Sequence, residues 1–367
     1  ANNQEYRRLS CSSEIAERTL REIYLAAFET AVREGKPDTV MCSYNKINGT
    51  FASENHWLLT EVLRDEWGFE GYVMSDWGAV NDRVRGLEAG LDLEMPASGG
   101  HTDAEIVAAV KDGTLDEAVL NRAVERILRI IFKFADDRRP GDFDKEKHDR
   151  LAEKIAEESM VLLKNDGLLP LPKAGKKIAF IGKFAQKPRF QGGGSSHIDS
   201  CKITGALEAA GQLPEITSDI TYAQGYDTAE DRTDPALLAE AVKAAEEADV
   251  AVIFAGLPDA FESEGYDRSH MQMPECQNEL IREILRVQKN TVVVLHNGSP
   301  VEMPWAGDVN AILESYLCGQ AVGAAQVRLL FGLANPCGKL AETIPLKLQD
   351  NPSYLNFPGD GQTVEYK

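Results

Sequence analysis

The stretch Gly68-Phe-Glu-Gly-Tyr-Val-Met-Ser-Asp-Trp-Gly-Ala-Val80 decides how the first part of the chain is read. Its run Tyr72-Val-Met74 is apolar and stands between two glycine-containing turns, which predicts a short buried strand. An acid and an indole, Asp76 and Trp77, follow the run at the carboxyl end of this strand. Ligand sites in α/β folds collect at that end of the strands, so Asp76 is a candidate functional residue. The alternative is that Asp76 only caps the helix that follows.

Strands and helices are predicted to alternate around this stretch. A helix with one apolar face is expected from an N-cap at Ser13 to Gly35. A strand over Thr39–Tyr44, a helix from Ser53 and a further strand over Leu91–Met95 are also expected, which indicates a parallel α/β layer. About three strands are too few for a closed eight-stranded barrel, and a bare layer would leave apolar edges open. We therefore expect that barrel strands upstream of this sequence are missing from it.

The character of the sequence changes after a strongly periodic helix over Leu115–Ala135. Residues 136–149 (DDRRPGDFDKEKHD) are mostly charged and contain Pro-Gly, which predicts a linker. A new series of apolar runs then alternates with helices, which is typical of a doubly wound, mostly parallel sheet. The expected strands are Lys177–Ile181, Val250–Ala255, Thr291–Leu295 and Ala311–Tyr316. We predict a first domain over 1–135, a linker over 136–149 and a second domain over 150–367.

Composition excludes several classes of function. The formal net charge of −20 argues against a nucleic-acid partner, which would require a basic face. No apolar run approaches the length of a membrane span, so no membrane partner is expected. The six cysteines and six histidines show no ligand spacing, so we expect no metal and no cofactor. Unpaired cysteines point to a cytoplasmic protein, and homo-oligomer formation stays open.

Several longer motifs follow one another along nearly the whole chain. The first part contains Val40-Met-Cys-Ser-Tyr-Asn-Lys-Ile-Asn-Gly49, Leu63-Arg-Asp-Glu-Trp-Gly68, Gly71-Tyr-Val-Met-Ser-Asp-Trp77 and Gly90-Leu-Asp-Leu-Glu-Met-Pro96. The second part contains Ser159-Met-Val-Leu-Leu-Lys-Asn165, Leu168-Leu-Pro-Leu171, Gly192-Gly-Gly-Ser195, Glu262-Ser-Glu-Gly-Tyr-Asp-Arg268 and Asn335-Pro-Cys-Gly-Lys339. In this order the motifs resemble glycoside hydrolase family 3, and most closely its β-glucosidase branch.

The resemblance implies a fold and an activity. The fold would be α/β: the C-terminal part of a (β/α)8-type barrel, followed by an α/β sandwich with a mostly parallel sheet. The activity would be that of a retaining exo-acting β-glycosidase, which hydrolyses small β-glucosides or short oligosaccharides from the non-reducing end. The family nucleophile matches Asp76, and the acid/base matches Glu264, with Glu262 as the competing assignment. The substrate contacts implied by the resemblance are Met41, Tyr44, Trp77, Glu262, Arg268, Gly193 and Ser195.

The chain also departs from the family pattern. Relatives carry further barrel strands before the segment Asn2-Asn-Gln-Glu5, including a Lys-His pair that holds sugar hydroxyls, and they continue beyond Lys367. We therefore expect a fragment that lacks the front of the barrel and the C-terminal end. An inactive or merely sugar-binding remnant is the alternative function, and β-xylosidase or another β-glycosidase specificity is the alternative activity. The Glu motif argues against the N-acetylglucosaminidase branch.

The residues themselves allow plainer interpretations of the same motifs. Retaining hydrolysis needs two carboxyl groups about 5–5.5 Å apart, and only the fold can bring together residues as distant in sequence as Asp76 and Glu264. Without the resemblance, the Glu motif would be read as a solvated acidic loop, and Trp77 as a core indole. Gln191–Ser196 is rich in glycine but lacks the Gly-Lys-Ser/Thr ending of a phosphate loop. A loop that lets backbone approach a ligand explains it better.

Overall fold

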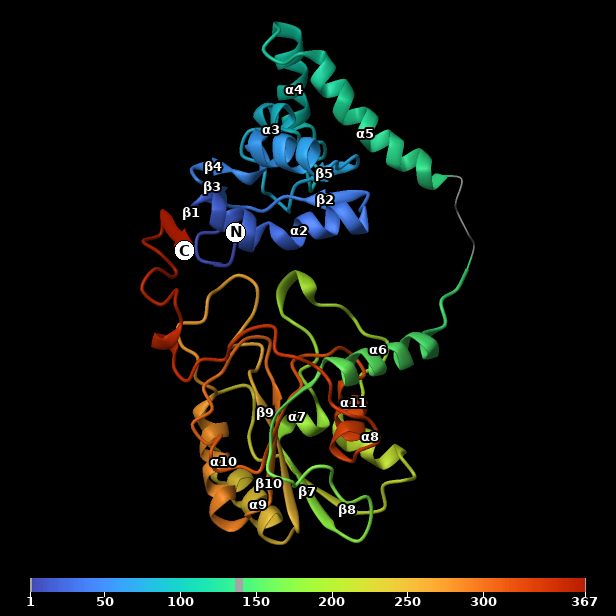
Figure 1. The fold of residues 1–367 in the computed structure, drawn as a ribbon, viewed down its shortest axis with the longest axis vertical. Helices are drawn as coiled ribbons and strands as arrows, with labels where there is room; N and C mark the ends of the chain where they lie inside the picture. Colours follow the sequence, from blue (N-terminus) through green and yellow to red (C-terminus); the bar gives the residue numbers. More distant parts are fainter. Residues whose placement is uncertain (1, 136–140, 367) are drawn as a thin grey trace. The chain divides into compact units, whose positions relative to one another are not determined.

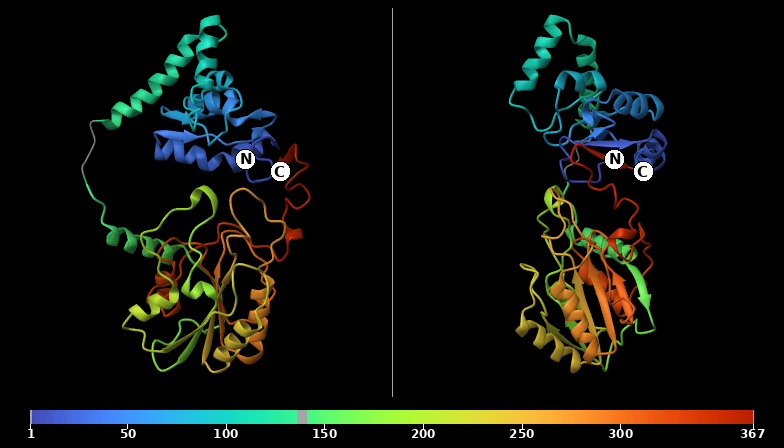
Figure 2. Two further views of the ribbon diagram at one scale, coloured as in Figure 1. Left: turned by 180° about the vertical axis from the view of Figure 1, so that it is seen from behind. Right: turned by 90° about the vertical axis from the view of Figure 1, so that its left-hand side faces the viewer.

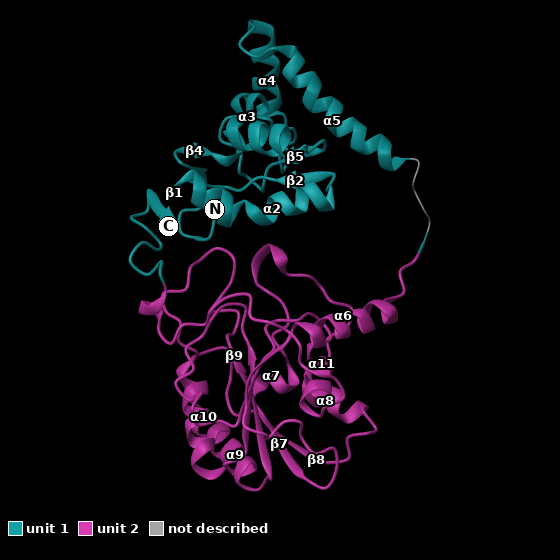
Figure 3. Ribbon diagram, viewed as in Figure 1, with its two compact units in different colours: residues 1–141, 352–367 teal, residues 142–351 magenta. Residues whose placement is uncertain are grey.

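The computed structural model describes residues 2–135 and 141–366 of the chain. The chain divides into two compact units (Figure 3). Unit 1 consists of residues 1–141 and 352–367, and unit 2 consists of residues 142–351. The division differs from the predicted domains, because residues 352–366 lie with unit 1 rather than with the second domain. Of the predicted linker 136–149, residues 136–140 lie outside the described residues, and a helix already begins at Lys145.

Unit 1 holds two small sheets. The parallel pair β2 (Thr39–Met41) and β5 (Tyr72–Met74) is the layer expected from the sequence, in the register Met41 opposite Met74. The strand expected over Leu91–Met95 is reduced to an isolated bridge between Leu93 and Met74, although backbone hydrogen bonds still join this segment to Val73 and Ser75. The second sheet has the order β12-β1-β3-β4, and its strands are β12 (Thr363–Tyr366), β1 (Ser12–Ile15), β3 (Lys46–Ile47) and β4 (Thr50–Phe51).

The start of the chain differs from the sequence prediction. Ser13 is not an N-cap, because it lies inside β1 and pairs in parallel with Val364 at the other end of the chain. This pairing joins residues about as far apart in sequence as the chain allows, so no local pattern could have indicated it. The helical segments of unit 1 are α1 (Glu17–Thr19), η1 (Leu20–Tyr24), α2 (Ala26–Thr30), η2 (Ala31–Gly35), η3 (Ala52–Glu54), η4 (Trp57–Glu66), α3 (Arg83–Ala89), α4 (His101–Asp112) and α5 (Glu117–Ala135).

Unit 2 is an open six-stranded sheet with helices on both faces (Figure 1, Figure 2). The strand order is β6-β11-β10-β9-β7-β8, and only β6 runs antiparallel to its neighbour. Helices α9 and α10 pack together on one face, and α6, α8 and α11 pack together on the other. Strands β9 and β10 are buried along their whole length, which accounts for their uninterrupted apolar sequences. The predicted doubly wound sheet is confirmed.

The bounds of unit 2 agree with the predicted runs to within two residues. The strands are β6 (Val161–Asn165), β7 (Lys177–Ile181), β8 (Asp219–Ala223), β9 (Val250–Gly256), β10 (Thr291–His296) and β11 (Ala311–Glu314). The helical segments are α6 (Lys145–Ser159), α7 (Lys183–Gln186), η5 (Gly194–Ser196), α8 (Ala206–Gln212), α9 (Pro235–Glu246), α10 (Glu275–Val287), α11 (Val322–Leu330) and η6 (Leu348–Asp350). The sequence analysis missed the two edge strands, β6 and β8, because both are only partly buried.

Candidate active site

Asp76 lies directly after β5, at the edge of the sheet where β2 also ends. Its Oδ1 accepts hydrogen bonds from the Tyr44 hydroxyl at 2.9 Å and from the Trp77 backbone N–H at 2.7 Å. The other oxygen, Oδ2, has no hydrogen-bond partner among the described residues. A carboxylate that is fixed through one oxygen and open at the other suits nucleophilic attack, because its orientation is set before a substrate arrives.

The interpretation of Asp76 as a helix cap is wrong. Helix α3 begins after Asp82, whose side chain accepts a hydrogen bond from the Arg85 N–H at 3.0 Å. Asp82 therefore satisfies the first turn of the helix, and Asp76 stands six residues before it. The acid at the strand end has no structural duty at this helix.

The three predicted neighbours of Asp76 are placed in different ways. Tyr44 is buried and uses its hydroxyl on Asp76, and the Arg8 guanidinium lies 4.5 Å from the centre of its ring. Trp77 is 57% exposed, so it is not a core indole, and its ring is open to a ligand. Met41 is also exposed, at 51%. The exposed indole of Trp77, next to Asp76 in the chain, offers an apolar face of the kind that packs against a sugar ring.

A buried acid that the sequence analysis missed holds the strand that carries Asp76. Asp92 accepts hydrogen bonds from the β5 backbone at Val73 (2.8 Å) and from two guanidinium groups, Arg64 at 2.7 Å and Arg126 at 3.0 Å. The Asp92 side chain has no exposed surface. Burial lowers the pKa of Arg64 to about 10, and the adjacent Asp92 opposes that shift. The Gly-Leu-Asp motif therefore acts as an anchor for β5.

Glu264 lies in unit 2, on the loop that follows β9, and it contacts the glycine-rich loop. Its Oε2 accepts a hydrogen bond from the Ser195 backbone N–H at 2.6 Å. A Cβ atom at Gly193 would overlap the Ser263 side chain, and one at Gly194 would overlap Glu264 itself. Only glycine permits this approach, and Gly194 also has a φ of +77°. The predicted residues Gly193, Ser195 and Glu264 are thus brought together.

Glu262 and Arg268 face inward instead. The Glu262 carboxylate accepts hydrogen bonds from Arg189, the Ser299 hydroxyl and the Gly298 N–H. Arg268 donates to Ser299 Oγ at 2.8 Å and to the Pro300 carbonyl at 3.0 Å, and burial lowers its pKa. Both side chains hold the loop to residues 298–300, which follow β10, and their substrate contacts stay predictions. Arg189 carried no sequence signal, because it stands outside every recognised motif.

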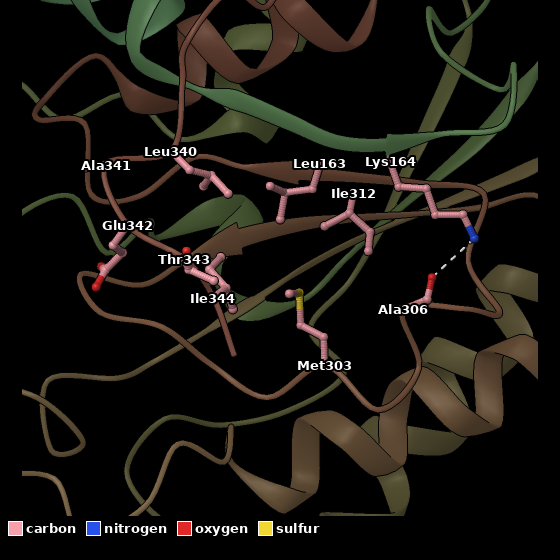
Figure 4. Close-up of a pocket in the computed structure, with 10 residues that line it drawn as sticks. All are labelled: Leu163, Lys164, Met303, Ala306, Ile312, Leu340, Ala341, Glu342, Thr343 and Ile344. Atoms are coloured by element: carbon pink, nitrogen blue, oxygen red, sulfur yellow. Dashed lines mark hydrogen bonds between the residues drawn. The ribbon is translucent and has the colours of Figure 1, made fainter. Parts of the chain in front are cut away.

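One hollow of unit 2 lies away from the predicted site residues. This cavity of about 820 Å³ lies beside strands β6 and β11 and residues 340–344, with Leu163, Met303 and Ile312 in its wall (Figure 4). Its polar side chains include Lys164, which donates to the Ala306 carbonyl at 3.2 Å, and it contains none of the predicted site residues. Within residues 2–135 and 141–366, no group of three His, Cys, Asp or Glu could hold a metal ion. No described helix is long and apolar enough to cross a membrane.

Comparisons with protein families cover both parts of the chain. Residues 10–130 match the N-terminal domain of glycosyl hydrolase family 3, and residues 160–367 match its C-terminal domain. The predicted fold class, a barrel part followed by an α/β sandwich domain, is confirmed.

Individual relatives are close in sequence and in fold. Thermostable β-glucosidase B of Acetivibrio thermocellus is 57% identical over all of this chain and 49% of its own length. An exo-α-(1→6)-L-arabinopyranosidase of Bifidobacterium longum is 48% identical over all of the chain and 49% of its own. The crystal structure of a β-glucosidase from Bifidobacterium adolescentis superimposes with a TM-score of 0.95 at 48% identity, over all of this chain and 54% of that one. The chain spans about half the length of the curated relatives it matches.

Proposed function

The chain belongs to glycoside hydrolase family 3, and we propose that it forms part of a retaining exo-acting β-glycosidase of the β-glucosidase type. Asp76 would attack the anomeric carbon, and Glu264 would protonate the departing oxygen and then activate water. The proposal is carried by two carboxylates in matching motifs that are each oriented by a backbone N–H through one oxygen, Asp76 by Trp77 and Glu264 by Ser195. Small β-glucosides are the proposed substrates, and no cofactor takes part.

Covalent trapping tests the nucleophile. A 2-deoxy-2-fluoro-β-glucoside with an activated leaving group should form a stable adduct, which peptide mapping should place on Asp76. Asp76→Ala should remove the adduct, whereas Asp82→Ala, which changes only the cap of α3, should leave it. An adduct on another residue would overturn the assignment, and a complete lack of adduct and of turnover would favour the inactive or sugar-binding alternative.

The acid/base role of Glu264 can be tested by removing its carboxyl group and then restoring turnover with azide. Glu264→Ala should lose most of its kcat/KM on substrates with poor leaving groups and little of it on dinitrophenyl glycosides, whose leaving group needs no protonation. Its kcat should fall on both substrates, because hydrolysis of the glycosyl-enzyme loses its general base. Added azide should restore turnover, because it can take the place of water without a general base. Equal loss of kcat/KM on both substrates without rescue would move the acid/base role elsewhere.

A second specificity has an observation of its own. The Bifidobacterium longum relative with 48% identity is an exo-α-(1→6)-L-arabinopyranosidase. Aryl β-D-glucosides, β-D-xylosides and α-L-arabinopyranosides should therefore be compared by kcat/KM. The glucoside should lead, and a higher value for the arabinopyranoside would assign that specificity instead.

A further inference from the structure

The loop that carries Glu264 is held by a side chain outside every motif. Residues 257–266 follow β9 and contain no regular element beyond a bridge between Ser263 and Tyr266. Arg189 is buried and crosses the base of this loop. It donates to the Leu257 carbonyl at 3.0 Å, to Asp259 at 2.9 Å and to the Glu262 carbonyl at 3.2 Å, and it also binds the Glu262 carboxylate. One guanidinium group thus ties the loop together at three of its residues.

Glu262 extends the same attachment to the neighbouring strand. Its Oε1 is shared by Arg189 and the Gly298 N–H (2.5 Å), and its Oε2 accepts the Ser299 hydroxyl. Only 13% of the side chain is exposed. Both carboxylate oxygens of Glu262 are therefore engaged by groups of the protein itself.

The backbone of Arg189 is fixed in turn by a buried histidine. His296 Nδ1 lies 3.1 Å from the Arg189 carbonyl, and Nε2 lies 2.9 Å from the amide nitrogen of Gln326. That amide also donates to Ser315 Oγ, whose own hydrogen goes to the Leu295 carbonyl. Nε2 must then accept, and Nδ1 carries the hydrogen that binds Arg189. Burial lowers the pKa of His296 to about 4, in keeping with this neutral form.

We propose that Arg189 and Glu262 are positioning residues for the general acid/base, and that the first glutamate of Glu262-Ser-Glu264 anchors the loop rather than transferring protons. The inference rests on the proposed function. Glu264 stands two residues beyond the ion pair, so the anchor sets the position of its backbone, while the Ser195 N–H sets its carboxylate. A small shift of the Glu264 carboxyl group would matter, because a displacement of about 1 Å can lower the rate roughly 10²-fold.

Leaving-group dependence separates anchoring from proton transfer. Glu262→Gln and Arg189→Met should lower kcat/KM on an alkyl β-glucoside about 10- to 100-fold and on the dinitrophenyl glucoside much less. Azide should restore neither variant, whereas it should restore Glu264→Ala. Arg189→Lys should recover only part of the loss, since a lysine cannot reproduce the several directed bonds. The control is Lys183→Met, which removes a partly exposed pair with Asp227 and should change nothing.

Hydrogen exchange tests the anchor without relying on turnover. Glu262→Gln and Arg189→Met should speed exchange in the peptide covering 257–266, while Glu264→Ala and Lys183→Met should leave it near the wild-type rate. Unchanged exchange in both anchor variants would overturn the inference, as would azide rescue of Glu262→Gln with formation of a glycosyl azide. If the wild-type protein shows neither turnover nor adduct, the proposed function fails, while the exchange result still decides whether the anchor exists.

Discussion

Replacing Glu314 by Gln should make the protein more stable at alkaline pH. Glu314 ends β11 and is fully buried, with no cation paired to it among the described residues. Its carboxyl accepts hydrogen bonds from the Tyr316 N–H at 2.9 Å and from the Asn297 amide at 3.1 Å. Burial raises its pKa from 4.5 to about 8, and the neighbouring Glu262 charge adds to the shift. The folded protein therefore keeps Glu314 protonated at neutral pH.

The sign of the effect follows from proton linkage. Between pH 4.5 and 8 the carboxyl is ionised in the unfolded chain but protonated in the folded one. The folded state then binds more protons, so the free energy of unfolding falls as the pH rises through this range. At 1.36 kcal/mol for each pKa unit, the loss between pH 5 and pH 8 amounts to roughly 3–4 kcal/mol. The neutral amide of Gln should remove this dependence.

Urea unfolding at pH 5, 6, 7 and 8 measures the predicted difference. Wild type should lose stability toward pH 8, and Glu314→Gln should lose about 3 kcal/mol less. At pH 5 the variant should be weaker by about 1 kcal/mol, because one hydrogen bond to Asn297 is rearranged. Measuring hydrogen exchange in β10 and β11 as well restricts the comparison to unit 2. The control is Glu215→Gln, because Glu215 is exposed. An unchanged pH slope in Glu314→Gln would refute the reasoning.

Three further predictions test the rest of the site. Asp92→Asn should destabilise unit 1 by about 3–5 kcal/mol in thermal unfolding, because the buried guanidinium of Arg64 and the partly buried one of Arg126 lose their anion; a loss below about 1 kcal/mol would contradict this. Gly194→Ala should reduce kcat/KM about 100-fold, since its Cβ would displace Glu264, and unchanged kinetics would show that the loops need not touch. Burial raises the pKa of Cys42 to about 11, so iodoacetamide at pH 8 should alkylate the exposed Cys201 and Cys337 and spare Cys42, as peptide mapping would show.

Local pattern was enough for the four inner strands of unit 2 and for one member of the candidate site. The apolar runs at β7, β9, β10 and β11 predict strands because each is long and buried on both faces. Asp76 could be singled out because an acid directly after such a run stands at the functional edge of a parallel sheet. The motif order added the roles that we propose for Asp76 and Glu264. Each of these inferences uses only residues that are adjacent in the sequence or a motif that is already known.

Contacts between distant residues could not be predicted in this way. The pairing of β1 with β12 turns the expected N-cap at Ser13 into a strand residue, since backbone bonds to residue 364 outweigh a local helix signal. The motif match favours Glu264 over Glu262 as the acid/base, but it could not show which groups bind each carboxylate. Arg189, 73 residues before Glu262, occupies the first glutamate, while Ser195 reaches the second.

The sequence by itself therefore determined most of the α/β elements, the family and the candidate nucleophile, because periodicity and motif order are properties of the chain. The tertiary structure decided which groups bind each carboxylate: Arg189, Gly298 and Ser299 bind Glu262, and the Ser195 N–H binds Glu264. A side chain's availability depends on the donors that the fold brings to it, and these donors come from other strands and loops.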